Sequence, residues 1–346
     1  EGEEGGAVCS LIELFHSTTS VLLRHEVAYA LGQMQAASAI EFLNELLCDS
    51  QEDPVVRHEA AEALGAIGTS ACEPLLRAHV ADCHSEVAET CELALARLEH
   101  HAALANAGAK GPCACEKLPQ RIVALEAAAE ATSPGTTLSL AEQLALLDES
   151  ADSTAPTACE LPTESPDVAS RAAGIRMDTL AGFDQEVAAY ASVDPAPAAS
   201  GSLPELRTMV LDRSLPMFDR YGAMFALRDK AARGEEREDA VLALCKALDD
   251  HDSTDSSLFK HEVAFVLGQL EDAASVPALC RAVRNEREHG MVRHEAAEAL
   301  GAIGCETAMQ LLSEYATHTE AILRDSCVVA LHMYDREAFL AAGVVV

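Results

Sequence analysis

The chain has 346 residues, enough for two domains or one long repeat array, and it carries 24 Lys and Arg against 57 Asp and Glu, a formal net charge of −33. This acidity argues against nucleic-acid binding, because phosphates need basic side chains, and it suits a basic protein partner. Aromatic residues make up only 4% and Trp is absent, so Ala, Leu and Val must fill the core, which favours packed helices over a β-sandwich or barrel.

The cysteine pattern and the hydropathy of the chain indicate the cellular compartment in which the protein is expected. The 12 cysteines are scattered without a paired pattern, which is typical of a reducing environment. No signal peptide is visible, and no apolar run reaches the roughly 18 residues that a membrane span requires. We therefore expect a cytoplasmic protein that does not enter the membrane.

Residues 1–100 predict a row of paired helices. Between Val56 and Ile67, apolar residues recur at every third or fourth position, the stripe of a helix that packs on one face. Pro54 suits the start of this helix and Gly68 its end. Small Ala side chains allow close helix approach. The pattern is typical of HEAT-type repeats, which stack into a solenoid.

Residues 101–200 differ in composition from the repeats. They are rich in Ala, Ser, Thr and Pro and contain no recurring helical motif. We expect a long, largely disordered linker or insertion, with one amphipathic helix at 138–147.

Residues 201–346 repeat the first half. The segment Val56–Gly68 recurs letter for letter at Val292–Gly304, a shift of 236 positions, and the same shift places His25 on His261. The chain is therefore expected to contain two homologous halves. A helical pair predicted at 203–233 has no counterpart before His25, so we expect the N-terminal half to lack its first repeat.

The dipeptide His-Glu occurs four times, twice in each half and 33 residues apart. The corresponding positions of the flanking repeats carry Glu89-Thr90 and Asp325-Ser326 instead. One copy alone would most simply be the solvated end of a helix. Four copies that stop at the flanking repeats indicate positions kept for function. These pairs are His25-Glu26, His58-Glu59, His261-Glu262 and His294-Glu295.

Imidazole and carboxylate together suit iron, manganese or zinc. Stacked helices lie about 10 Å apart, so His25 and His58 could share one ion with carboxylates of their half, and His261 and His294 a second. This predicts an all-α fold, a HEAT-type solenoid in two halves that face each other across a metal site. The ligand set matches non-haem iron oxygen chemistry, although a hydrolase could also use two metals. Neighbouring side chains on a helix point about 100° apart, so some glutamates would bind metal and others a cationic substrate.

Several motifs resemble the deoxyhypusine hydroxylase family. They are residues 25–34 and 56–68, their second-half copies, residues 192–197 and residues 220–228. The resemblance covers about residues 10–100 and 190–335, and the linker is longer than is usual in the family. It implies a di-iron monooxygenase that hydroxylates the deoxyhypusine side chain of the translation factor carrying hypusine. The reaction would use O2 and an electron donor and would complete hypusine biosynthesis.

The resemblance also implies a set of site residues and a cofactor. It assigns two Fe2+ per chain to a site formed by His25, Glu26, His58, Glu59, His261, Glu262, His294 and Glu295. Within this set, we favour Glu59 and Glu295 as metal carboxylates. We favour Glu26 and Glu262 as the groups that meet the amines of the substrate.

Two other functions fit the repeats. The first is a metal-free HEAT-repeat adaptor that binds a basic protein. The second is a relative of the phycobilin lyases, which share Arg-x-x-Ala-Ala-x-Ala-Leu-Gly repeats, although nothing in this sequence offers a special nucleophile for a bilin. Metal content separates the iron enzyme from the adaptor.

Overall fold

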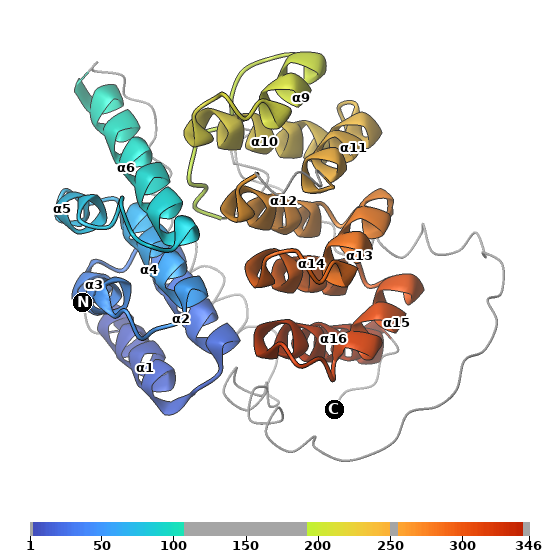
Figure 1. Ribbon diagram of the computed structural model, residues 1–346, viewed down its shortest axis with the longest axis horizontal. Helices are drawn as coiled ribbons and strands as arrows, with labels where there is room; N and C mark the ends of the chain where they lie inside the picture. The colour runs from blue at the N-terminus through green and yellow to red at the C-terminus, as the bar shows by residue number, and fades with distance from the viewer. Residues whose placement is uncertain (1–2, 107–191, 250–254, 342–346) are drawn as a thin grey trace.

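The computed structural model describes residues 3–106, 192–249 and 255–341, and its regular secondary structure is helical throughout these ranges. Figure 1 shows two stacks of paired helices, one blue to teal and one yellow to red, facing each other. The prediction of an all-α repeat fold in two halves is therefore confirmed. The amphipathic helix predicted at 138–147 lies outside the described residues.

The stacks consist of outer and inner helices. In the N-terminal half, the outer helices are α1 (Glu3–Ser17), α3 (Ile40–Cys48) and α5 (Cys72–Arg77), and the inner helices are α2 (Val21–Gln33), α4 (Pro54–Ile67) and α6 (Ser85–Asn106). In the C-terminal half, the outer helices are α9 (Leu203–Leu211), α11 (Arg237–Leu248), α13 (Val276–Arg284) and α15 (Glu306–Tyr315), and the inner helices are α10 (Met217–Ala232), α12 (Ser257–Leu270), α14 (Gly290–Ile303) and α16 (Ala321–Ala341). Short 3-10 turns at Ala37–Ala39 and Ala273–Ser275 precede α3 and α13.

The ends of α4 follow from its sequence. The Asp53 side chain accepts a hydrogen bond from the Val55 backbone N–H, and Pro54 occupies the first turn, where its missing N–H costs nothing. The helix ends at Gly68, whose φ of 69° is in the left-handed region. Its copy α14 ends in the same way at Gly304, with φ 64°.

Glycines let the inner helices approach closely. A Cβ on Gly32 of α2 would lie 2.7 Å from the Cα of Ala63 on α4, and a Cβ on Gly65 would lie 2.6 Å from the Cβ of Ala94 on α6. The second half repeats this arrangement at Gly268 and Gly301. Larger residues would push the stacked helices apart and change the distance between side chains that they carry.

The two halves contact each other with twofold-like symmetry. The α2 helix packs against α16, and the equivalent pair is α12 against α6. The hydroxyl of Ser20, which caps α2, donates to Asp325 on α16 at 3.3 Å, and the hydroxyl of Ser256, which caps α12, donates to Glu89 on α6. The partners in these two bonds are related by the 236-residue shift. Equivalent surfaces therefore meet, and the inner helices of both halves face one central site.

The ends of the expected insertion belong to the folded body. The α6 helix continues to Asn106, and residues 192–195 lie at the site between the two halves. The remainder of the insertion, residues 107–191, lies outside the described residues. Among the helices of the described ranges, none is both long and apolar enough to cross a membrane.

Candidate metal centre

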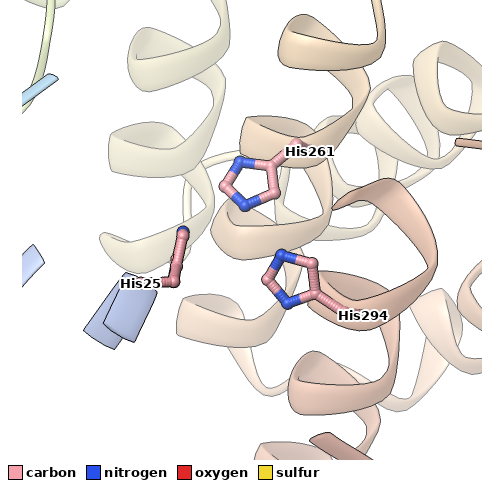
Figure 2. Close-up of side chains that lie close together, drawn as sticks. All are labelled: His25, His261 and His294. Atoms are coloured by element: carbon pink, nitrogen blue, oxygen red, sulfur yellow. The ribbon is translucent and has the colours of Figure 1, made fainter. Parts of the chain in front are cut away.

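Four histidine side chains from four inner helices meet in one buried cluster. His25 lies on α2, His58 on α4, His261 on α12 and His294 on α14, and no more than 5% of any of them is exposed. Ring centroids lie 5.6 Å apart within the N-terminal half and 5.4 Å apart within the C-terminal half. Figure 2 shows His25 beside His261 and His294, at centroid distances of 6.1 and 5.3 Å. The cluster thus joins the two halves of the chain.

The equal position of these residues in their helices explains why they meet. Each of the four histidines is the fifth residue of its helix. Within each half, the inner helices that carry the histidines pack directly against each other, α2 against α4 and α12 against α14. Residues at the same helical position therefore share one height and one direction. Since the two halves face each other, both histidine pairs point to the centre.

The cluster has nitrogen atoms without hydrogen-bond partners. In the described residues, eight buried side-chain nitrogen or oxygen atoms lack a partner, and six of these belong to the four imidazoles. They are Nε2 of His25, both nitrogens of His58, both nitrogens of His261 and Nε2 of His294. A buried polar atom without a partner costs about 1–3 kcal/mol, so six together indicate a missing binding partner. A neutral imidazole binds a metal through one nitrogen, so metal ions would satisfy four of these six atoms, one on each ring, and the residues therefore fit a metal.

Each half places a glutamate of one repeat against the histidine of the preceding repeat. Glu59 Oε2 lies 3.2 Å from His25 Nε2, and Glu295 Oε2 lies 3.4 Å from His261 Nε2. Neither contact has the geometry of a hydrogen bond, and both nitrogens lack a hydrogen-bond partner. Two atoms that bind the same ion at about 2.1 Å each also lie about 3 Å apart, and the lone pairs of both point at the ion. The two contacts are related by the 236-residue shift, so equivalent pairs of candidate ligands occur in both halves.

Among the described residues, three groups of side chains could hold a metal ion, with ligand atoms within 4.8 Å of one another. The first is His25, His58 and Glu59, the set expected for the N-terminal half. The second is His294, Glu295 and Glu298, and the third joins His25 to His261 and His294. The described residues thus bring the predicted histidines together, and Glu59 and Glu295 with them. Whether these two glutamates are the metal carboxylates stays a prediction.

Glu298 is a residue that the sequence reasoning missed. It lies four positions after His294, and its Oε1 is 3.4 Å from His294 Nδ1. Glu62 holds the same place after His58. The signal was present in the motif, because residues four apart lie on the same face of a helix. Adjacent His-Glu pairs alone do not reveal it.

Glu26 and Glu262, the predicted substrate contacts, both line a cavity beside the histidines. The cavity has a volume of about 70 Å³. Glu262 is 4% exposed, whereas the side chain of Glu26 is 39% exposed and accepts from His25 Nδ1 at 3.1 Å. The lining also includes Tyr29 and Phe265, which occupy equivalent positions in α2 and α12 and whose ring centroids are 6.3 Å apart. The cavity therefore combines carboxylates with an aromatic pair, a surface that suits an aliphatic chain bearing ammonium groups.

Burial controls the protonation of the cluster. It raises the pKa of Glu262 and of Glu295 well above the usual range and raises that of Glu62 to about 8. It lowers the pKa of His261 to about 4. The carboxylates therefore retain protons unless a cation joins them, and this imidazole stays neutral, the form that binds metal.

His25 differs from the other histidines. Burial alone would lower its pKa, but the negative charges of Glu59 and Glu26 raise the pKa well above the usual range. Burial lowers the pKa of His58 and His294 well below it. A positive charge is thus favoured where two carboxylates meet His25, and a metal dication would supply it.

The short segment 192–197 closes one side of the cavity. We call these residues the strap. The backbone N–H of Val193 donates to Oε1 of Gln33 on α2 at 2.8 Å, and Nε2 of Gln269 on α12 donates to the hydroxyl of Ser192 at 3.2 Å. Gln33 and Gln269 are equivalent under the 236-residue shift, so one strap is held by both halves. Ser192, Val193, Asp194 and Pro195 all line the cavity.

Comparison with known families identifies the repeat. The model of HEAT repeats matches residues 9–96 and 241–332, which contain all four histidines of the cluster. The two matched ranges cover more than half of the chain.

Curated relatives align with nearly the whole chain. A deoxyhypusine hydroxylase of Danio rerio is 40% identical over 319 residues, which cover 92% of this chain and 78% of the relative. The deoxyhypusine hydroxylase of Homo sapiens is 37% identical and that of Drosophila melanogaster 36%; each alignment covers 96% of this chain and 82% of the relative. The solved structure of human deoxyhypusine hydroxylase in complex with glycerol superposes with a TM-score of 0.67 at 36% identity, covering 96% of this chain and 85% of that one.

Proposed function

The chain belongs to the deoxyhypusine hydroxylase family, and from that membership we propose that it hydroxylates the deoxyhypusine side chain of a translation factor at a site holding two iron ions. The observation that carries the metal part of the proposal is the cluster of four buried imidazoles with six unpartnered nitrogens. Such a cluster would be costly if it were only structural.

We assign one iron to each half of the chain. His25, His58 and Glu59, whose ligand atoms lie close together, would hold the first. The residues equivalent to them under the 236-residue shift, His261, His294 and Glu295, would hold the second. Two imidazoles and one carboxylate, with positions left open, are the ligand set of non-haem iron oxygenases. The equivalent contacts of His25 with Glu59 and of His261 with Glu295 support this assignment.

The chemistry requires an external electron donor. Insertion of one oxygen atom of O2 into a C–H bond yields an alcohol, and the second oxygen leaves as water after taking up two electrons and two protons. Iron, when bound, supplies the activation of O2. The protein must bring the substrate carbon to the site and exclude bulk water, and the small cavity behind the strap suits both tasks.

Glu26 and Glu262 are proposed to bind the amines of the substrate. Deoxyhypusine is a long aliphatic side chain that carries a secondary and a primary amine, both protonated at neutral pH. Glu26 and Glu262 come from opposite halves and line the same cavity, so they can meet two separated ammonium groups. Tyr29 and Phe265 lie between the halves and offer an apolar wall to the methylene groups.

A cytoplasmic location is also proposed. It is supported by the free thiols of the described cysteines, which fit a reducing compartment. The metal-free adaptor is not favoured, because the relatives are enzymes by name and the matched histidines are buried, away from any partner surface.

The test is hydroxylation by the purified protein. We expect a deoxyhypusine-bearing factor, incubated with O2, a reductant and the iron-loaded protein, to gain the mass of one oxygen atom. The Glu99→Gln variant, which changes a side chain that is 73% exposed, should retain this activity. Absence of any mass gain with iron-loaded wild-type protein would contradict the proposed function.

A further inference from the structure

The two halves of the metal centre differ in the residues that support the imidazoles. His294 Nδ1 contacts Glu298 Oε1 at 3.4 Å, and the hydroxyl of Ser326 on α16 donates to the same Oε1 at 2.8 Å. His294 therefore has one nitrogen with a carboxylate partner and one, Nε2, that is unpartnered. A histidine ligand commonly binds metal through one ring nitrogen while a carboxylate holds the N–H of the other, which fixes the tautomer and the plane of the ring.

The equivalent residues of the N-terminal half do not form this chain of contacts. Both nitrogens of His58 are unpartnered, although Glu62 occupies the position of Glu298. The residue in the place of Ser326 is Thr90, and its hydroxyl donates to the backbone carbonyl of Glu86 at 2.7 Å. A helical threonine commonly bonds back to the carbonyl four residues earlier. Thr90 is thereby engaged within its own helix.

Glu62 also meets a different neighbour. The buried guanidinium of Arg97 lies near it, and each group shifts the pKa of the other. Arg97 donates to the carbonyl of Ala66 at 3.2 Å and also to that of Gly65, so it is fixed at the end of α4. The second half has Met333 at the matching sequence position. The motif around the two glutamates is identical, and the neighbouring repeat decides which partner each glutamate finds.

We propose that Glu298, held by Ser326, is a positioning residue that orients His294 for metal binding, so that the two metal positions are inequivalent and the C-terminal one depends on Ser326. The proposal rests on the proposed function, because it assumes that His294 is a metal ligand. It adds that Glu298 acts through the imidazole, since its Oε1 is already shared between His294 and Ser326.

The contact between His25 and Glu26 is different in kind. Glu26 accepts from His25 Nδ1 at 3.1 Å, but its side chain is 39% exposed and lines the cavity. It is therefore free to exchange the imidazole for a substrate amine. Glu298 also lines the cavity and its side chain is 28% exposed, but it has a second anchor in the buried Ser326, which is 0% exposed and is expected to hold it in place when substrate binds.

The experiment uses Co2+ as a spectroscopic probe in full-length, metal-free protein. A His58→Ala background leaves the C-terminal position intact, and a His294→Ala background leaves the N-terminal one. In the His58→Ala background, Ser326→Ala and Glu298→Gln are expected to weaken Co2+ binding by about 10- to 100-fold and to shift the visible ligand-field bands. In the His294→Ala background, Thr90→Ala should leave both the affinity and the bands unchanged.

The outcomes separate this proposal from the proposed function. If Ser326→Ala and Glu298→Gln bind Co2+ as tightly as their background and with the same bands, the positioning role is wrong, even where the wild-type protein hydroxylates deoxyhypusine. Equal weakening by Thr90→Ala would also overturn it, because the two halves would then be equivalent. A wild-type protein that binds Co2+ but hydroxylates no substrate would contradict the proposed function alone. Circular dichroism of each variant identifies loss of folding. The conservative Ser326→Thr variant is expected to bond back within α16, as Thr90 does within α6, and so to weaken Co2+ binding as Ser326→Ala does.

Discussion

The histidines of the cluster are expected to act in pairs, one pair for each iron. His58→Ala removes two unpartnered nitrogens from the N-terminal pair, and His294→Ala removes Nε2 from the C-terminal pair. Each variant should retain about one iron per chain instead of two and should lose hydroxylation almost completely, because both metals are needed at one site. Iron analysis of protein purified under argon measures this. A variant that keeps both irons would contradict the assignment of one histidine pair to each metal.

Glu26 and Glu262 are expected to act on substrate and not on metal. Glu262→Gln and Glu26→Gln should lower kcat/KM by about tenfold or more, since each removes the charge that faces a substrate ammonium. Iron content should remain that of the wild-type protein. Steady-state kinetics with parallel metal analysis measures both. Loss of one iron in either variant would instead make that glutamate a ligand.

The sequence predicted that the four histidines would lie together because they repeat at equal positions. Each is the fifth residue of an inner helix, so spacing alone predicted that they would meet. The motif alone does not predict the roles of Glu62 and Glu298. Both lie in the identical stretch around His58 and His294, yet Ser326 holds one and Arg97 lies near the other. Those neighbours belong to the next repeat, and only the three-dimensional packing brings them close.

Close packing of neighbouring repeats sets the distance between the proposed metal ligands. Gly32→Ala would place a Cβ 2.7 Å from the Cα of Ala63 and force α2 away from α4. We expect a loss of about 1–3 kcal/mol in the free energy of unfolding. We also expect reduced iron content, because His25 lies on α2 and Glu59 lies on α4. Urea denaturation measures the first effect and metal analysis the second.

Gly6→Ala is the matched control for this substitution. Gly6 is an exposed residue of α1, and a Cβ there would meet no atom within 4 Å. Since Ala is a better helix former than Gly, the control should be neutral or stabilising by up to about 1 kcal/mol. Equal stability of the Gly32→Ala and wild-type proteins would show that the helices have room to adjust.

Helix periodicity and end signals predicted the elements of the repeats well. Pro54 and Gly68 mark the ends of α4 as expected, because each acts through its own backbone geometry. The strap could not be predicted in the same way. It lies in the stretch expected to be disordered, and its position depends on Gln33, Gln269 and Arg228, which are distant in the sequence.

At the scale of the whole molecule, the strap is one of the contacts that hold the two halves around the site. Asp194 accepts from Arg228 at 2.8 and 2.6 Å, and Arg228 is only 1% exposed. Asp194→Asn should therefore cost about 1–3 kcal/mol of unfolding free energy, since it removes one of the two carboxylates that pair with the buried Arg228 charge, the other being Asp229. We also expect a raised KM for substrate, because the strap forms a wall of the cavity.

A neutral surface substitution provides the comparison for Asp194→Asn. Glu99, whose side chain is 73% exposed, should tolerate Glu99→Gln with a change of no more than about 0.5 kcal/mol. Urea denaturation and steady-state kinetics of both variants measure the difference. An unchanged KM in Asp194→Asn would mean that the strap does not shape the substrate cavity.

Two homologous halves that meet with twofold-like symmetry explain why one cluster contains all four histidines. The symmetric bonds of Ser20 with Asp325 and of Ser256 with Glu89 fix the halves so that α2 and α4 face α12 and α14. The acidity of the whole chain, a net charge of −33, then favours approach of a basic substrate protein.

The most direct test of the account is the position of iron in the protein. Anomalous diffraction from crystals of the iron-loaded protein, recorded at the iron absorption edge, locates each metal without reference to activity. We expect two peaks, one contacting His25, His58 and Glu59 and the other contacting His261, His294 and Glu295. No peak at the cluster, or iron bound only outside it, would contradict the account.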